Sequence, residues 1–130
     1  MIVLDASAAL ELLLRTPTGA RVEARVLSRA ESMHAPHLVD VEVAQVLRRY
    51  AATGVLTASR GREALQDMID LDLTRYPHDL LLPRIWELRG NLTAYDAAYV
   101  ALAEALAAPL VTCDRKIANA LIHHARVEVI

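Results

Sequence analysis

The sequence has 130 residues and a net charge of −2 at neutral pH. This length fits one domain, residues 1–130, in which folding buries roughly two-thirds of the unfolded surface. The charge excludes a strongly basic nucleic-acid-binding surface over the whole molecule, and the single cysteine excludes an intramolecular disulfide. No apolar run reaches membrane-spanning length and no signal peptide is recognisable, so we expect a cytoplasmic protein that does not contact a membrane.

Short apolar runs alternate along the chain with longer helix-favouring stretches. Residues 2–4 are β-prone and show no polar alternation, which is typical of a strand buried on both faces. Pro17 behind Thr16 predicts the start of one helix, and Gly54 the end of another. In chain order, strands are predicted at residues 2–4, 33–36, 71–76, 110–113 and 127–130. Helices are predicted at residues 6–14, 17–29, 38–52, from 57 or 59 to 69, 78–88, 93–107 and 115–123.

This alternation predicts a three-layer α/β/α domain with a central, mostly parallel sheet of four to five strands. Asp5 directly follows the first predicted strand, and Asp114 directly follows the predicted strand at residues 110–113. In open α/β folds, ligands bind outside the carboxyl ends of the strands. Both carboxylates are therefore expected at the ligand-binding edge of the sheet.

Two further acids belong with this pair if their helices begin at the same edge. Glu42 lies one turn into the helix that follows the second strand, and Asp96 lies in the first turn of the helix before the strand that leads to Asp114. Carboxylates held together repel one another unless a cation neutralises them. Oxygen ligands suit Mg²⁺ or Mn²⁺, and these ions bind phosphates and activate water for attack.

Each acid also has a structural explanation that the sequence leaves open. Asp5 and Asp114 are each placed to cap the helix that follows. Asp96 is placed to form a capping box with Thr93. Glu42 fits a solvated helix position, with Asp40 taking its place in the site. A joint site accounts for all four positions with one cause, whereas the structural explanations need four. The scattered histidines give no zinc signature, and the isolated glycines give no phosphate-binding loop.

Four segments together resemble the motifs of PIN-domain nucleases. They are Asp5 in Ile-Val-Leu-Asp-Ala-Ser-Ala, Glu42 in Val-Glu-Val-Ala-Gln-Val-Leu, Asp96 in Tyr-Asp-Ala-Ala-Tyr-Val-Ala-Leu-Ala, and Asp114 in Leu-Val-Thr-Cys-Asp. Over its whole length the chain resembles the VapC toxins of bacterial toxin–antitoxin pairs. The resemblance implies an endoribonuclease that depends on Mg²⁺ or Mn²⁺, with these four acids as its catalytic and metal-binding residues. It also implies a homodimer, inhibited by a small antitoxin that inserts into the active-site groove.

The resemblance extends to residues around the acids. Ser7 and Thr112 match positions where the family usually carries a small hydroxyl residue near the metal site. Gln45 departs from the family, which often has Asn three residues after the glutamate. This departure puts a packing or supporting contact in doubt, but no metal ligand.

Several other polar residues have weaker claims to the site. Arg15, Arg115 and Lys116 lie just past the two strand-end acids, where they fit either RNA phosphate contacts or a solvated face. Tyr95 and Tyr99 lie one helical turn apart, and this spacing favours packing in a core or an interface over stacking on bases. The RNA that is cut, and its sequence, cannot be read from the chain.

Two rival functions fit the same acids less well. The first is a phosphatase or phosphoryl-transfer enzyme that uses Asp5 as its nucleophile. Haloacid-dehalogenase-like phosphatases carry a second Asp two residues after the nucleophile, where this chain has Ser7. Receiver domains have an acidic pair after the first strand, where Asp5 is followed by Ala6. A non-enzymatic module whose acidic pocket captures an arginine of a partner is the remaining alternative.

Overall fold

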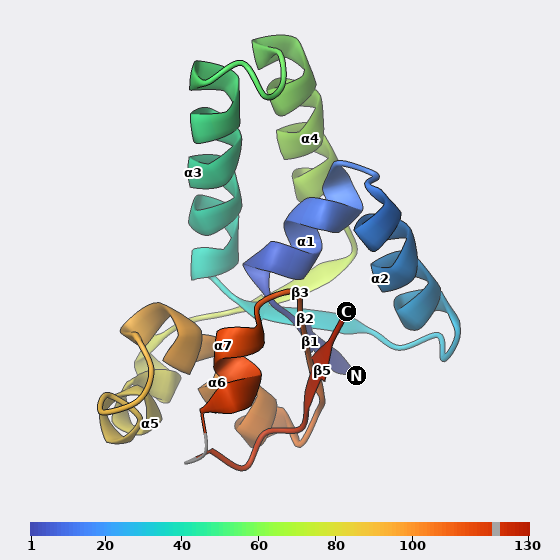
Figure 1. Ribbon diagram of the computed structural model, residues 1–130. Helices are drawn as coiled ribbons and strands as arrows, with labels where there is room; N and C mark the ends of the chain where they lie inside the picture. The colour runs from blue at the N-terminus through green and yellow to red at the C-terminus, as the bar shows by residue number, and fades with distance from the viewer. Residues whose placement is uncertain (121–122) are drawn as a thin grey trace.

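The computed structural model describes residues 1–120 and 123–130. Its strands form one sheet in which every neighbouring pair runs parallel (Figure 1). They are β1 (Ile2–Leu4), β2 (Met33–Pro36), β3 (Leu73–Tyr76), β4 (Leu110–Thr112) and β5 (Val127–Val129), in the spatial order β3-β2-β1-β4-β5. The predicted α/β fold with a parallel sheet of four to five strands is confirmed.

The order of the strands reverses between β1 and β4. After β1 the chain places β2 and then β3 on one side, and later places β4 and β5 on the other. Such a reversal leaves a crevice outside the carboxyl ends of the two central strands. Asp5 immediately follows β1 and Asp114 lies two residues after β4, so both strand-end acids are at this crevice.

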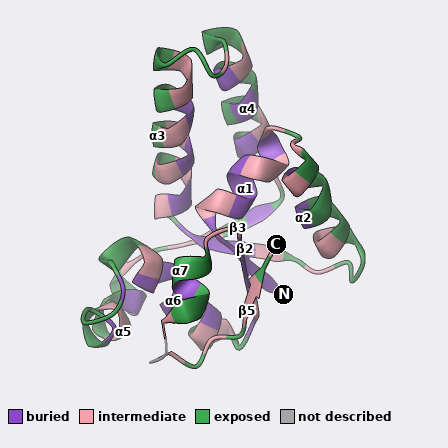
Figure 2. Cartoon of the chain, viewed as in Figure 1, coloured by how far each residue is buried: buried purple, intermediate pink, exposed green. Residues whose placement is uncertain are grey.

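The sheet is buried because helices cover both of its faces. The residues of β1 and β4 are fully buried, as expected for continuous apolar strands in a parallel sheet. On one face lies α6 (Ala94–Leu106), in which the run 97–103 is buried against β1, β2 and β4 (Figure 2). Its many alanines let the helix backbone approach the strands closely.

The remaining helices complete the layers. The opposite face carries α1 (Ala6–Leu13), which packs against α2 (Pro17–Leu27) and α3 (Leu38–Ala52). α3 pairs with α4 (Ala58–Asp70), and the two extend side by side away from the sheet (Figure 1). The 3₁₀ turn η1 (Asp79–Leu81) and α5 (Leu82–Glu87) pack on α6, and α7 (Arg115–Asn119) packs on β5. Within the residues that the structure describes, no helix is both long and apolar enough to cross a bilayer.

Two predicted helices differ from the observed ones. The helix predicted at residues 78–88 is divided into η1 and α5, with Pro83 in the first turn of α5, where its missing N–H is harmless. The helix predicted at residues 115–123 ends at Asn119; His123 is not helical, and residues 121–122 lie outside the described residues. The chain must return to the starting edge of β4 before β5 begins. Ala120, which follows α7, has extended backbone angles of φ −77° and ψ 112°, and this departure from helical geometry ends the helix.

A close crossing of α2 over α1 fixes the orientation of α1, the helix that follows Asp5. At Gly19, an added Cβ would lie 2.0 Å from the carbonyl oxygen of Glu11 and 2.6 Å from its carbon. The hydroxyl of Thr16 accepts a hydrogen bond from the Gly19 N–H at 2.9 Å, which caps α2 beside this contact. Both obstacles to a side chain are backbone atoms, so no side-chain rotation relieves them.

We expect Gly19→Ala to lower the free energy of unfolding by about 1–3 kcal/mol, the usual cost of overpacking. Gly61→Ala is the matched control, because a methyl group in α4 would meet only the side chain of Leu56, at 3.3 Å. Helix propensity predicts no loss there, or a gain of about 0.5–1 kcal/mol. Urea unfolding of the three proteins measures both effects. Equal stability of the two variants would contradict the close crossing.

Candidate active site

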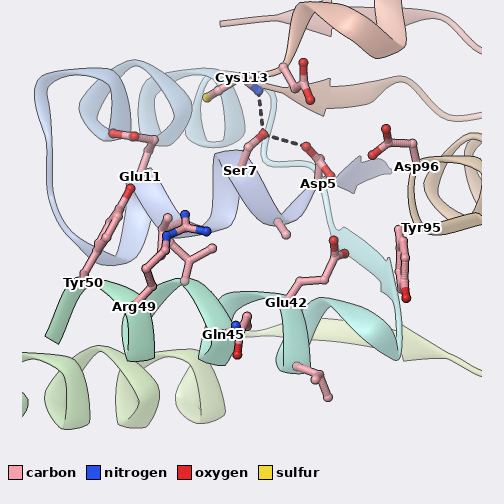
Figure 3. A pocket seen from close by; sticks show the side chains of 15 residues that line it. Asp5, Ser7, Glu11, Glu42, Gln45, Arg49, Tyr50, Tyr95, Asp96 and Cys113 are labelled. Atoms are coloured by element: carbon pink, nitrogen blue, oxygen red, sulfur yellow. Dashed lines mark hydrogen bonds between the residues drawn. The ribbon is translucent and has the colours of Figure 1, made fainter. Parts of the chain in front are cut away.

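A pocket of about 700 Å³ opens outside the carboxyl ends of β1 and β4, where the strand order reverses. Residues of α1, α3, the start of α6 and the segment after β4 line it (Figure 3). All four acids predicted from the sequence are among them: Asp5, Glu42, Asp96 and Asp114. The fold thus gathers around one pocket carboxylates that come from both ends of the chain.

Two hydroxyl groups hold the carboxylate of Asp5. Its Oδ2 accepts hydrogen bonds from Ser7 at 2.6 Å and from Thr112 at 2.7 Å. The two hydroxyls lie 3.2 Å apart, and each accepts a backbone N–H: Ser7 from Cys113 and Thr112 from Asp114, both at 2.9 Å. Asp5 precedes α1 but its side chain makes no capping bond. Asp5 is therefore the N-cap residue of α1 by position, but its carboxylate, which is only 6% exposed, bonds the two hydroxyls and not the helix start.

Glu42 projects from the second turn of α3 and is held by a buried tyrosine. The hydroxyl of Tyr99 donates a hydrogen bond to Oε1 of Glu42 at 2.6 Å. Burial raises the pKa of the Glu42 carboxyl, and the negative charges of Asp5 and Asp96 raise it further, while the bond from Tyr99 lowers it. Oε2 makes no hydrogen bond to the described residues.

Asp96 and Asp114 lie at the starts of two helices. Burial raises the pKa of Asp96, and the charges of Asp5 and Asp114 add to this effect. The hydroxyl of Thr93 accepts the N–H of Asp96 at 3.2 Å, so the start of α6 is capped. Asp114 does cap its helix, because its Oδ1 accepts the N–H of Lys116 at 2.9 Å. Asp114 therefore both caps α7 and lines the acidic pocket.

The donor chemistry of the pocket fits a hard divalent cation. The four acids offer only oxygen, and none of them forms an ion pair within the described residues. In residues 1–120 and 123–130, however, no three Asp, Glu, His or Cys side chains are grouped closely enough to ligate one ion as they stand. A bound cation would have to draw the carboxylates inward.

Asp40 lies outside the pocket, although it is only two residues from Glu42. Nε of Arg75 donates to both carboxylate oxygens of Asp40, at 2.9 and 2.8 Å. The same guanidinium donates to the carbonyl of Met68, which ties α3 to β3 and α4. The structure therefore gives Asp40 a structural partner and leaves the site position to Glu42.

The three predicted phosphate-binding cations do not line the acidic pocket. Arg15 ends α1 in the left-handed backbone conformation, and its guanidinium lies 3.8 Å from Asp67. Arg115 and Lys116 are exposed on α7. The charge of Lys116 does reach the pocket, because it lowers the pKa of Asp96.

The pocket also contains residues that the sequence reasoning missed. Glu11, Arg49 and Tyr50 line it, and the pattern of Glu42, Val46 and Arg49 on one face of α3 is a signal that could have found Arg49. Tyr95 is 65% exposed at the pocket, so it does not lie in the core, and the alternative of an interface stays a prediction. Tyr99 is fully buried, as predicted, but no spacing in the sequence indicates its bond to Glu42. Gln45, the departure from the family pattern, is exposed and also lines the pocket.

Comparison with known proteins identifies the family. The model of the PIN domain matches residues 2–121. The chain is 54% identical over 119 residues to ribonuclease VapC9 of Mycobacterium tuberculosis, covering 92% of this chain and 90% of that protein. It is 42% identical over 130 residues to ribonuclease VapC12 of the same organism, covering 100% and 99%.

Solved structures share the fold. VapBC2 from Rickettsia felis, bound to a promoter DNA fragment, superposes with a TM-score of 0.71 at 15% identity, covering 99% of this chain and 98% of that one. PAE2754 from Pyrobaculum aerophilum superposes with a TM-score of 0.70 at 25% identity, covering 98% and 83%. With the PIN model matched over nearly its whole length, the chain belongs to the PIN-domain family, alongside the VapC ribonucleases.

Proposed function

We propose that this chain is the endoribonuclease toxin of a toxin–antitoxin pair, and that it hydrolyses RNA phosphodiester bonds with Mg²⁺ or Mn²⁺. The observation that carries the proposal is the meeting of four carboxylates at the reversal of strand order, where Glu42 and Asp96 have raised pKa values. The relatives named VapC ribonucleases support the same activity. Cellular RNA is the substrate, so the cytoplasm is the proposed location.

Asp5, Glu42, Asp96 and Asp114 would hold the ion. When bound, Mg²⁺ or Mn²⁺ supplies Lewis acidity and positive charge beside the phosphate oxygens. Ser7 and Thr112 fix the Asp5 carboxylate through Oδ2 and leave Oδ1 without a hydrogen bond to the described residues. Tyr99 holds Oε1 of Glu42, and we assign Oε2 to accept the proton of the attacking water. Attack by water on phosphorus breaks the P–O3′ bond, and the leaving 3′-oxygen takes a proton from solvent, which gives 5′-phosphate and 3′-hydroxyl ends.

A cleavage assay on charge-removing variants tests this site. We expect Asp5→Asn and Asp96→Asn to abolish RNA cleavage. In chelator, Asp96→Asn should melt at or above the wild-type temperature, because it removes one charge from a repelling cluster. Asp72→Asn is the control, since Asp72 is exposed and outside the pocket. Wild-type activity in Asp5→Asn or Asp96→Asn would remove that residue from the mechanism.

The pH dependence of stability provides a second test. Glu42 and Asp96 have pKa values above those of unfolded carboxyls, so the folded state binds more protons than the unfolded state between the two values. Stability without metal should therefore fall as pH rises from the unfolded pKa through the folded pKa. Mg²⁺ binds only the ionised, folded site, so it should reduce the fall and raise the melting temperature.

The measurement is a series of thermal melts across this pH range, in chelator and in Mg²⁺. Asp96→Asn should show a smaller fall than the wild type in chelator, because one of the two shifted groups is gone. Identical pH profiles with and without Mg²⁺, or cleavage that survives excess chelator, would contradict the metal-dependent mechanism.

The proposed partner is a small antitoxin of the VapB kind, and the VapBC2 complex of Rickettsia felis, which shares the fold, supports this assignment. An acidic pocket accepts a guanidinium, which stays charged and bonds carboxylate oxygens in pairs. Leu10, Val41 and Val46 line the same pocket and suit an amphipathic helix. We also propose a homodimer, supported by large exposed apolar side chains on η1 and α5: Leu80, Leu82 and Trp86.

We expect the antitoxin to carry an arginine, in an extended segment after its helix, that enters the acidic pocket. Changing that arginine to alanine should weaken inhibition more than binding, because the helix remains as an anchor. Affinity measurements and RNA cleavage with both antitoxin forms decide the point. An altered form that inhibits as well as the parent would exclude the pocket as the inhibitory contact.

A further inference from the structure

The pocket has three chemically distinct parts (Figure 3). The carboxylates of Asp5, Glu42 and Asp96 occupy its middle. Arg49 and Tyr50 reach into one end from the second half of α3, and Tyr95 stands at the other end, beside Asp96. A site that only bound a cation would need neither a guanidinium nor an exposed aromatic ring at its ends.

Arg49 carries a positive charge that the described residues leave unpaired. Five carboxylates line the same pocket, yet none lies within ion-pair distance of this guanidinium: Asp5, Glu11, Glu42, Asp96 and Asp114. Its contact is the ring of Tyr50, with the guanidinium carbon 5.8 Å from the ring centre. The side chain is exposed and permanently charged, so an anion in the pocket can reach it.

The spacing on α3 indicates which anion this is. Glu42 and Arg49 are seven residues apart on one helix face, roughly 10 Å along the axis. Arg49 is therefore placed for a phosphate that neighbours the reacting one. A polyanionic chain that crosses from the neutralised carboxylates to Arg49 gains contacts at both.

Tyr95 supplies the matching contact for a base. Its side chain is 65% exposed at the edge of the pocket, next to Asp96 in the first turn of α6. An aromatic ring beside a phosphate-binding groove is a stacking surface for an unpaired base. A base in a duplex is stacked already and cannot lie on it, so this contact selects single-stranded RNA.

We propose that two residues outside the acidic centre bind the RNA: Arg49 holds a phosphate next to the scissile one, and Tyr95 stacks a nearby unpaired base. The proposal rests on the proposed function, and it adds these two binding residues to it.

Salt-dependent RNA binding tests the role of Arg49. The probe is a fluorescently labelled, mixed-sequence single-stranded oligoribonucleotide in Mg²⁺, and every protein carries Asp5→Asn so that the RNA stays intact. Arg49→Gln should weaken binding and reduce the slope of log K against log salt by about 0.7, the value for one phosphate contact on a single strand. Arg48→Gln is the matched control, because it removes the same charge from an exposed neighbour that does not line the pocket.

The aromatic contact has its own pair of variants. Tyr95→Ala should weaken binding by about tenfold and Tyr95→Phe should retain it, because stacking needs the ring and not the hydroxyl. A duplex of the same sequence should bind the parent protein and Tyr95→Ala alike. Sedimentation of each variant measures the oligomeric state in parallel.

Three results would overturn the proposal. Equal salt slopes for Arg48→Gln and Arg49→Gln would mean that Arg49 attracts the RNA only through long-range electrostatics and makes no specific phosphate contact. Unchanged RNA binding with weakened antitoxin binding in Arg49→Gln would assign that residue to a protein contact. A changed oligomeric state in Tyr95→Ala, with RNA affinity retained, would assign Tyr95 to an interface. Failure of the proposed function is detected separately, in a cleavage assay with the protein that retains Asp5, where the RNA would stay intact.

Discussion

The bonding of the Asp5 carboxylate to two hydroxyls is the interaction on which the rest of the site depends. Asp5 follows β1, Ser7 lies in the first turn of α1, and Thr112 ends β4, so three elements meet at one carboxylate oxygen. The hydroxyls also accept the N–H groups of Cys113 and Asp114, which fixes the path of the chain out of β4. Hydrogen bonds to an ionised group are stronger than neutral ones, so this cluster holds the two central strand ends in register.

The other carboxylates are arranged around this fixed charge at a cost in stability. Burial and the neighbouring charges raise the pKa values of Glu42 and Asp96, and the hydroxyl of Tyr99 offsets only part of this for Glu42. The buried sheet and the alanine-rich α6 provide the packing that tolerates such repulsion. A cation that enters the pocket relieves it. One electrostatic cause would therefore account both for the proposed divalent cofactor and for a proposed inhibitor that supplies a guanidinium.

The helices outside the sheet give the pocket its length. The crossing at Gly19 orients α1, and the Arg75–Asp40 contact fixes α3 with Glu42 and Arg49 on its pocket face. The start of α6 brings Tyr95 and Asp96 to the opposite side. The strand ends that bring the acids together thus lie between α3, which carries the guanidinium of Arg49, and α6, which carries the aromatic ring of Tyr95. This arrangement suits a long, polyanionic ligand better than a small one.

The sequence by itself determined the acidic edge of the sheet, because the short apolar or β-branched runs at residues 2–4 and 110–113 favour buried strands, and parallel strands end at a common edge. Asp5 and Asp114 were predictable for that reason. Only the tertiary structure decided between Asp40 and Glu42, which lie roughly 200° apart around α3, so the rotation of the helix against its neighbours makes the choice. It also decided that Tyr99 meets Glu42 and that α7 ends at Asn119. Such contacts join residues far apart in the chain, and local periodicity carries no information about which distant side chains packing brings together.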